Sequence, residues 1–206
     1  MRPYPDLVPY IVALDARVML PRPGRPDIAL MHLAAQQVYG PRWSTQVLQD
    51  VRELWRRTYP HAPAEAINTH IELLGRREFA YDALVRPHPF LKRHEQARID
   101  LAPYVLHALE AAAYGGAHAV LTTAPEEFPE ELVHGLVVQG VDEFLSGWFE
   151  LYPAKYAMAF DNWARENQAR KNGPQTVAKL IDRLEREAPV FAREARVGLL
   201  GMDETP

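Results

Sequence analysis

The most chemically versatile side chains of this sequence are its histidines and acidic residues. Glu131-Leu-Val-His134 is a Glu-x-x-His pair whose i, i+3 spacing places both side chains on one face of a helix. Di-iron bundles use two such pairs with additional Glu residues, whereas this chain has one, and His107-Ala-Leu-Glu110 reverses the order. We favour a solvated first helical turn, where acids complement the helix dipole. A helical metal-dependent enzyme using Glu131 and His134 remains an alternative.

Other motifs of catalysis and cofactor binding are missing from the sequence. It contains no G-x-S-x-G nucleophile motif, no glycine-rich phosphate loop and no G-x-G-x-x-G dinucleotide motif. Because the chain has no cysteine, disulfides, thiolate metal sites and a cysteine nucleophile are excluded. We therefore expect no catalytic residue, no cofactor and no bound metal, and a non-enzymatic role is favoured.

Residues 63–74 carry polar side chains suited to contacts with nucleic acid. If the apolar side chains of this segment face inward on a helix, Asn68 and Thr69 face outward and His70 lies at the flank. Asn68 suits a bidentate contact to adenine, and Thr69 a hydroxyl or methyl contact. Basic residues near this segment in the sequence would contact phosphates. These are Arg42, Arg76, Arg77, Arg86, Lys92 and Arg93.

Three amphipathic helices must position these side chains. They are predicted over Asp27–Val38, Ser44–Arg57 and Pro63–Leu74. Asp27 and Ser44 are suitable N-caps, and Gly75 follows the third helix where a helix-ending residue is expected. A β-prone stretch at residues 76–91 comes next.

This order of elements resembles the winged-helix, or helix-turn-helix, superfamily of DNA-binding proteins. The segments Trp43-Ser44-Thr45-Gln46-Val47 and Ala66-Ile67-Asn68-Thr69-His70-Ile71 are similar to its motif of a capped helix, a Pro-containing turn and a second helix with Ile at i and i+4. The resemblance covers residues 27–90 and implies binding of double-stranded DNA, often as a dimer. The superfamily also contains protein-interaction modules, so an all-helical interaction protein without nucleic-acid binding remains the main alternative.

Residues 99–200 are predicted to form an α-helical bundle. Their most apolar stretch, 133–152, repeats apolar residues at nearly every fourth position, which predicts a helix in the bundle core or at a dimer seam. The residues assigned to this stripe are Val137, Val141, Leu145 and Trp148. Pro153, Pro174 and Pro189 are predicted to interrupt or start helices.

Composition sets the outer limits of the interpretation. With 206 residues, 48% of them hydrophobic and 24% charged, the chain is typical of a globular protein. No apolar run approaches the roughly 18 residues needed to span a bilayer, so we expect a cytoplasmic protein without membrane contact. The net charge of −4 is unevenly divided, because residues 41–98 have a basic excess and residues 99–206 an acidic one. This asymmetry favours a basic binding half joined to an acidic assembly half.

These patterns predict a mainly α fold with four regions. They are an extended N-terminal arm over 1–26, a tri-helical winged-helix-like domain over 27–98, a helical domain that is the candidate for dimerisation over 99–200, and a disordered tail over 201–206. The predicted function is non-catalytic DNA binding, in regulation or DNA maintenance, by a homodimer.

Overall fold

The computed structural model describes residues 10–75, 83–85, 101–133, 135–171, 173–174 and 176–201. Its centre is a five-stranded, all-parallel sheet with strand order β3-β2-β1-β4-β5. The strands are β1 (Ile11–Leu14), β2 (Gly40–Ser44), β3 (Leu84–Val85), β4 (Ala119–Thr122) and β5 (Val137–Gly140). The protein is therefore an α/β protein, and the predicted mainly α, all-α fold is wrong.

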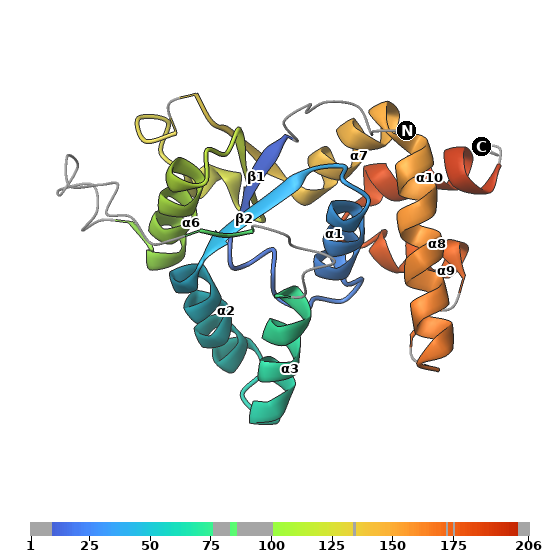
Figure 1. Ribbon diagram of the computed structural model, residues 1–206, viewed down its shortest axis with the longest axis horizontal. Helices are drawn as coiled ribbons and strands as arrows, with labels where there is room; N and C mark the ends of the chain where they lie inside the picture. The colour runs from blue at the N-terminus through green and yellow to red at the C-terminus, as the bar shows by residue number, and fades with distance from the viewer. Residues whose placement is uncertain are drawn as a thin grey trace, which may run out of the picture.

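Helices cover both faces of this sheet (Figure 1). They are α1 (Pro26–Ala35), α2 (Thr45–Thr58), α3 (Ala64–Leu74), α6 (Pro103–Tyr114), α7 (Val141–Leu151), α8 (Pro153–Ala169), α9 (Val177–Leu184) and α10 (Pro189–Leu200), with a short 3₁₀ helix, η2, at Pro125–Glu127. Helix α6 packs on β1, β2 and β4, while α7 packs on β4 and β5. The helices α7 to α10 lie together on the opposite side of the molecule from α6 (Figure 1).

Alternating side chains of the central strands enter two separate parts of the core. Ala13 and Val120 pack with α6, whereas Val12, Leu14 and Leu121 join the larger cluster that includes residues of α1 and α7. The two central strands β1 and β4 are therefore buried on both faces, as expected for a parallel sheet between helical layers.

Burial on both faces explains why the sequence indicated an extended arm around β1 but did not reveal the sheet. A strand covered on one face alternates apolar and polar residues, but β1 (Ile-Val-Ala-Leu) is apolar throughout and all four residues are buried. Such a short apolar run cannot be told from part of a helix by periodicity. As a result, β1 lies in the predicted N-terminal arm, and β5 interrupts the apolar stretch that was predicted to be one helix.

The three helices of the predicted winged-helix unit exist, but they do not follow one another directly. Strand β2 separates α1 from α2 and pairs in parallel with β1. Pro41 concealed this strand, because a proline lacks the N–H that a sheet ladder uses. The predicted N-cap of α2 is confirmed, since Ser44 Oγ accepts a hydrogen bond from the backbone N–H of Val47 at 3.3 Å. The N-cap of α1 is Arg25 rather than Asp27.

Two of the three predicted proline boundaries in the C-terminal region are confirmed. Pro153 begins α8 and Pro189 begins α10, whereas α9 begins at Val177 rather than at Pro174. Phe191 of α10 packs against Phe149, Tyr156 and Phe160, with ring centroids 5.7–5.8 Å apart. This aromatic cluster holds α7, α8 and α10 together. Within the ranges given above, no helix is long and apolar enough to cross a membrane.

We predict that Phe191→Ala lowers the free energy of unfolding by about 3–5 kcal/mol, because it empties the centre of this cluster. Urea denaturation followed by circular dichroism measures the change. Val190→Ala is the matched control, since Val190 is 42% exposed and its truncation should change stability by less than about 0.5 kcal/mol. Equal effects of the two substitutions would contradict the assignment of Phe191 to the core.

Candidate functional site

The order of the strands marks one end of the sheet as the place for a site. From β1 the chain moves to β2 on one side, whereas β4 pairs with β1 on the other side. Ligands of open α/β sheets bind beside the carboxyl ends of the strands at such a switch point. Asp15 directly follows β1, and Thr122 is the last residue of β4. Their side chains meet, because Thr122 Oγ1 donates to Asp15 Oδ2 at 2.6 Å.

Arg17 occupies the space between these side chains. Its Nε and Nη2 donate to Asp15 Oδ2 at 2.8 and 2.6 Å, and its backbone N–H donates to Asp15 Oδ1 at 3.0 Å. Nη2 also reaches Thr122 Oγ1 at 3.0 Å, and Nη1 donates to Glu127 Oε2 at 2.8 Å. We refer to Asp15, Arg17, Thr122 and Glu127 as the switch-point cluster.

The switch-point cluster is almost closed to solvent. Asp15 and Thr122 are fully buried and Arg17 is 9% exposed, while Tyr104 of α6 covers the guanidinium with its ring 4.5 Å away. Burial lowers the pKa of Arg17, but the hydrogen bond and charge of Asp15, with the charge of Glu127, outweigh it and raise this pKa above its usual value. The guanidinium is therefore charged and serves as the internal counterion of the two carboxylates.

The oxygen atoms of this cluster are the kind that hard divalent cations bind. In the structure these oxygen atoms form hydrogen bonds with Arg17. The guanidinium therefore occupies the position between the oxygens that a bound cation would take. In the part of the chain that the structure describes, no group of three or more histidine or acidic side chains is arranged to hold a metal ion.

The loop from β1 to α1 anchors α2 and α3 beside the switch-point cluster. His70 of α3 hydrogen-bonds the Met19 carbonyl at 2.7 Å, and Tyr59, which follows α2, donates to the Pro21 carbonyl at 2.6 Å. These contacts place α2 and α3 at the carboxyl end of the sheet, as Figure 1 also shows.

An ion pair between the half-buried Arg25 and the buried Asp27 lies beside this anchor. Arg25 donates to both carboxylate oxygens of Asp27, at 3.1 and 2.9 Å. His70 Nδ1 lies 4.0 Å from the same carboxylate. Burial raises the pKa of Asp27, although Arg25 opposes the shift, and burial lowers the pKa of His70.

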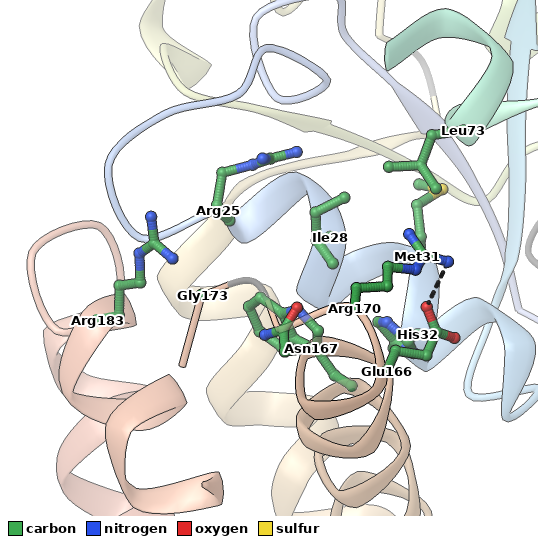
Figure 2. A pocket seen from close by; sticks show the side chains of 11 residues that line it. Arg25, Ile28, Met31, His32, Leu73, Glu166, Asn167, Arg170, Gly173 and Arg183 are labelled. Carbon is green, nitrogen blue, oxygen red and sulfur yellow. Dashed lines mark hydrogen bonds and ion pairs between the residues drawn. The ribbon is translucent and has the colours of Figure 1, made fainter. Parts of the chain in front are cut away.

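A second candidate site is a cavity of about 180 Å³ between α1, α8 and α9. Figure 2 shows Arg25, Arg170 and Arg183 at this cavity, together with His32 of α1 and Asn167 of α8. The buried ring of His32 stacks on Trp163 with centroids 5.9 Å apart. Burial lowers the pKa of His32 to about 4, and the charge of Arg170 contributes to this shift.

The structure distributes the residues predicted to contact nucleic acid over several environments. Asn68 and Thr69 are exposed on α3, whereas His70 is 5% exposed and bonded to Met19. Arg42 is half-buried on β2, where it donates to the Pro41 carbonyl. The remaining predicted residues lie outside the described residues. These are Arg76, Arg77, Arg86, Lys92 and Arg93.

The predicted apolar stripe does not lie on a single helix, and the Glu-x-x-His pair is not in a helical turn where the structure describes it. Val141 and Leu145 are buried on α7 with the half-buried Trp148, but Val137 lies on β5 and is 50% exposed. Glu131 is exposed in a turn, and His134 lies outside the described residues.

Sequence reasoning missed every member of the switch-point cluster. The signal was an apolar run followed at once by a polar residue: Asp15 after Ile11–Leu14, and Thr122 at the end of Ala119–Thr122. Polar residues at the carboxyl ends of parallel strands gather at one sheet edge, but this inference first requires that the runs be recognised as strands.

The sheet and the switch-point cluster define an α/β protein of the doubly wound class. A protein-family model described as the VapC50 C-terminal domain matches residues 141–197. This stretch comprises α7, α8, α9 and most of α10. Searches of the curated proteins and of the solved structures found no match to the chain.

We predict that Arg17→Met lowers the free energy of unfolding by about 3–5 kcal/mol, because it leaves the fully buried Asp15 carboxylate without its counterion. The double variant Asp15→Asn/Arg17→Met should recover a large part of this loss, since it removes the unpaired charge as well. Urea denaturation at pH 7 measures both. If the double variant is no more stable than Arg17→Met, the ion pair does not have the assigned role.

A second prediction concerns the pH dependence of stability. The pKa of His32 is about 4 in the folded protein and about 6.5 in an unfolded chain, so the unfolded state binds the extra proton between these values. The resulting stability is fully present above pH 6.5 and is lost as the pH falls toward 4, by roughly 2–3 kcal/mol. His32→Gln should reduce this pH dependence, as measured by urea denaturation at pH 7 and pH 4.5.

The matched control for that measurement is His61→Gln, because His61 is exposed. Both variants retain His70 and Asp27, so the titration of those two groups cancels in the comparison. A wild-type pH profile in His32→Gln would contradict the assigned role of His32.

Proposed function

We propose that this protein binds the phosphodiester backbone of nucleic acid at the carboxyl end of its sheet and does not cleave it. The observation that carries the proposal is the set of exposed polar and basic side chains on α2 and α3, which the loop after β1 anchors at the carboxyl end of the sheet. This position is where open α/β proteins bind ligands. Guanidinium groups bind phosphate directly through charge-assisted hydrogen bonds.

The surface around this end of the sheet supports an extended ligand. Arg56 and Arg57 are exposed on α2, and Asn68 and Thr69 are exposed on α3. Both helices are anchored on the loop that carries Arg17. The sequence between α3 and α6 adds further basic residues to the same part of the chain.

The Arg17 contacts are the reason for proposing binding without cleavage. Arg17 donates to Asp15, Thr122 and Glu127 at 2.6–3.0 Å, so a divalent cation would have to displace this guanidinium to reach their oxygens.

The second candidate function is metal-dependent hydrolysis of phosphodiesters. It is favoured by the oxygen donors of Asp15, Thr122 and Glu127, which would suit Mg²⁺ or Mn²⁺ once Arg17 swings away. The match of residues 141–197 to the VapC50 C-terminal domain supports a relationship between this chain and proteins that carry that domain. It leaves the choice between binding and hydrolysis to experiment.

We predict that the wild-type protein binds fluorescently labelled RNA or DNA with a dissociation constant that rises steeply between 50 and 200 mM salt, because phosphate contacts release counterions. Fluorescence anisotropy with EDTA present measures binding. Arg56→Gln/Arg57→Gln should weaken it and reduce the salt slope by about 2. Arg165→Gln, on the exposed face of α8, is the control and should bind as the wild type does.

The same labelled strands, incubated with Mn²⁺ and analysed by gel, separate the two candidates. Intact strands agree with binding alone. Mn²⁺-dependent cleavage that is lost in Asp15→Asn would establish the hydrolase instead. Failure to bind single-stranded RNA, single-stranded DNA and duplex DNA at 50 mM salt would overturn the proposal.

A further inference from the structure

The amino end of the central strand β1 is joined to β4 by a side chain as well as by the backbone. His118 directly precedes β4, and its backbone N–H donates to the Ile11 carbonyl at 2.8 Å. In the opposite direction, the backbone N–H of Ile11 donates to His118 Nδ1 at 3.0 Å. Ile11 is only 6% exposed, whereas His118 is exposed. The two hydrogen bonds therefore connect a buried strand to an imidazole ring that solvent reaches.

The imidazole of His118 serves as the acceptor where the backbone ladder of the sheet ends. Ile11 lies one residue before the paired residues of β1 and β4 that face solvent-excluded helices. On the β4 side the chain turns away toward α6, because the N–H of Ala117 donates to the Ala112 carbonyl at 2.8 Å. The Ile11 N–H bonds to the ring instead, and Nδ1 is the acceptor that this buried donor requires.

An acceptor nitrogen is present only in the neutral form of this ring. Neutral imidazole has one donor and one acceptor nitrogen, and the hydrogen bond from Ile11 identifies Nδ1 of His118 as the acceptor and Nε2 as the donor. In the imidazolium form both nitrogens are donors, so rotation of the ring does not restore an acceptor. Protonation therefore leaves a buried backbone N–H without its partner, which is unfavourable.

The groups around the ring of His118 carry no charge at neutral or mildly acidic pH. The ring of Tyr10 stacks on it, with centroids 5.1 Å apart and planes inclined by 18°, and burial raises the pKa of the Tyr10 phenol. From β5, Val137 donates its backbone N–H to the His118 carbonyl at 3.0 Å. The turn after α6, residues 115–117, contains glycine and alanine only. Within the described part of the chain, the ion pairs that involve a histidine do not include His118.

Tyr10 connects the hydrogen bond at His118 to the C-terminal helices. Its ring lies between the rings of His118 and Trp148, and its centroid is 4.8 Å from that of Trp148 on α7. Trp148 in turn stacks on Tyr152, with centroids 5.6 Å apart and planes inclined by 8°. His118 is thus the end member of a row of four rings. When its ring moves, Tyr10 loses the stacking partner on one side.

We propose that His118 is a proton-sensitive latch, which holds the first amide of β1 and the ring of Tyr10 in place when it is neutral and releases them when it is protonated. Histidine is the side chain that ordinarily titrates between about pH 5 and 8, and the released state binds the extra proton, so release is favoured as the pH falls. The change is local, because the paired residues Val12–Leu14 keep their ladder to β4. The latch lies at the amino end of the sheet and does not depend on the proposed function, which concerns the carboxyl end.

Nuclear magnetic resonance of the isotope-labelled full chain follows the latch directly. The wild-type protein is titrated from about pH 8 to about pH 5.5, and the signals of the Ile11 amide and the His118 ring are compared. We expect both to change with the same midpoint. Protection of the Ile11 amide from hydrogen exchange, corrected for the intrinsic effect of pH, should fall at least tenfold. The Asp15 amide, which donates to the Leu121 carbonyl at 3.0 Å, should keep its protection.

Two substitutions separate the acceptor from the titration. In His118→Asn the side-chain oxygen can accept the Ile11 N–H but does not titrate, so Ile11 should stay protected over the whole pH range. In His118→Ala the acceptor is missing, and Ile11 should be at least tenfold less protected at every pH. His61→Asn is the matched control, because His61 is exposed in the turn between α2 and α3, and it should titrate as the wild type does. Protection of Asp15 checks that each variant is folded.

The proposal fails on any of three results. The first is an Ile11 amide that does not respond while the His118 ring titrates. The second is the same pH response of Ile11 in His118→Asn as in the wild type. The third is a simultaneous loss of protection at Asp15, which would show general unfolding instead of a local release. Each of these leaves the nucleic-acid measurements on Arg56 and Arg57 unaffected.

Discussion

The buried carboxylate of Asp15 is the constraint on which the rest of the structure depends. It lies at the carboxyl end of the central strand β1 with no exposure to solvent, and a buried charge without a partner costs several kcal/mol. Arg17 and Thr122 meet this requirement through hydrogen bonds of 2.6–3.0 Å. Because Thr122 ends β4, its hydrogen bond to Asp15 holds the carboxyl ends of β1 and β4 together at the switch point. The oxygens of this site are also hydrogen-bonded to the guanidinium of Arg17.

The loop that begins with Asp15 connects both candidate sites. Arg17 belongs to the switch-point cluster. The carbonyls of Met19 and Pro21 form hydrogen bonds with His70 of α3 and with Tyr59 after α2. Arg25 lines the cavity beside α8 and α9. The two sites have opposite character. At the first, carboxylates are neutralised internally by one arginine. At the second, three arginines exceed the carboxylates that face them. A single loop thus links the sheet to the C-terminal helices, which form the part of the chain that matches the VapC50 C-terminal domain.

Local chemistry was enough to predict many helix boundaries. Ser44 begins α2 with the expected side-chain cap, and Pro153 and Pro189 begin α8 and α10. The same local signals led to a wrong fold class, because three helices in sequence were interpreted as a winged-helix unit while β2 between them was not recognised. Pro41 in β2 and the uniformly apolar β1 lack the alternation that identifies a strand covered on one face. The pairing of β1 with β2 and β4 joins segments that are distant in the sequence, so a local sequence pattern does not predict it.

The sequence by itself determined several helix starts, such as those at Ser44, Pro153 and Pro189, together with the absence of cysteine chemistry and the apolar character of each segment. These features depend on composition and on neighbouring residues. Only the tertiary structure decided which segments pair as strands, that Asp15 meets Thr122, 107 positions away, that Arg17 meets Glu127, 110 positions away, and that Arg25, Arg170 and Arg183 line one cavity. It also decided that His70, which the sequence pattern placed on the flank of a DNA-reading helix, is buried against the Met19 carbonyl. The physical reason is that burial and charge pairing are properties of three-dimensional neighbourhoods. The sequence gives the chemical type of each side chain, whereas the packing of the fold decides which side chains it contacts.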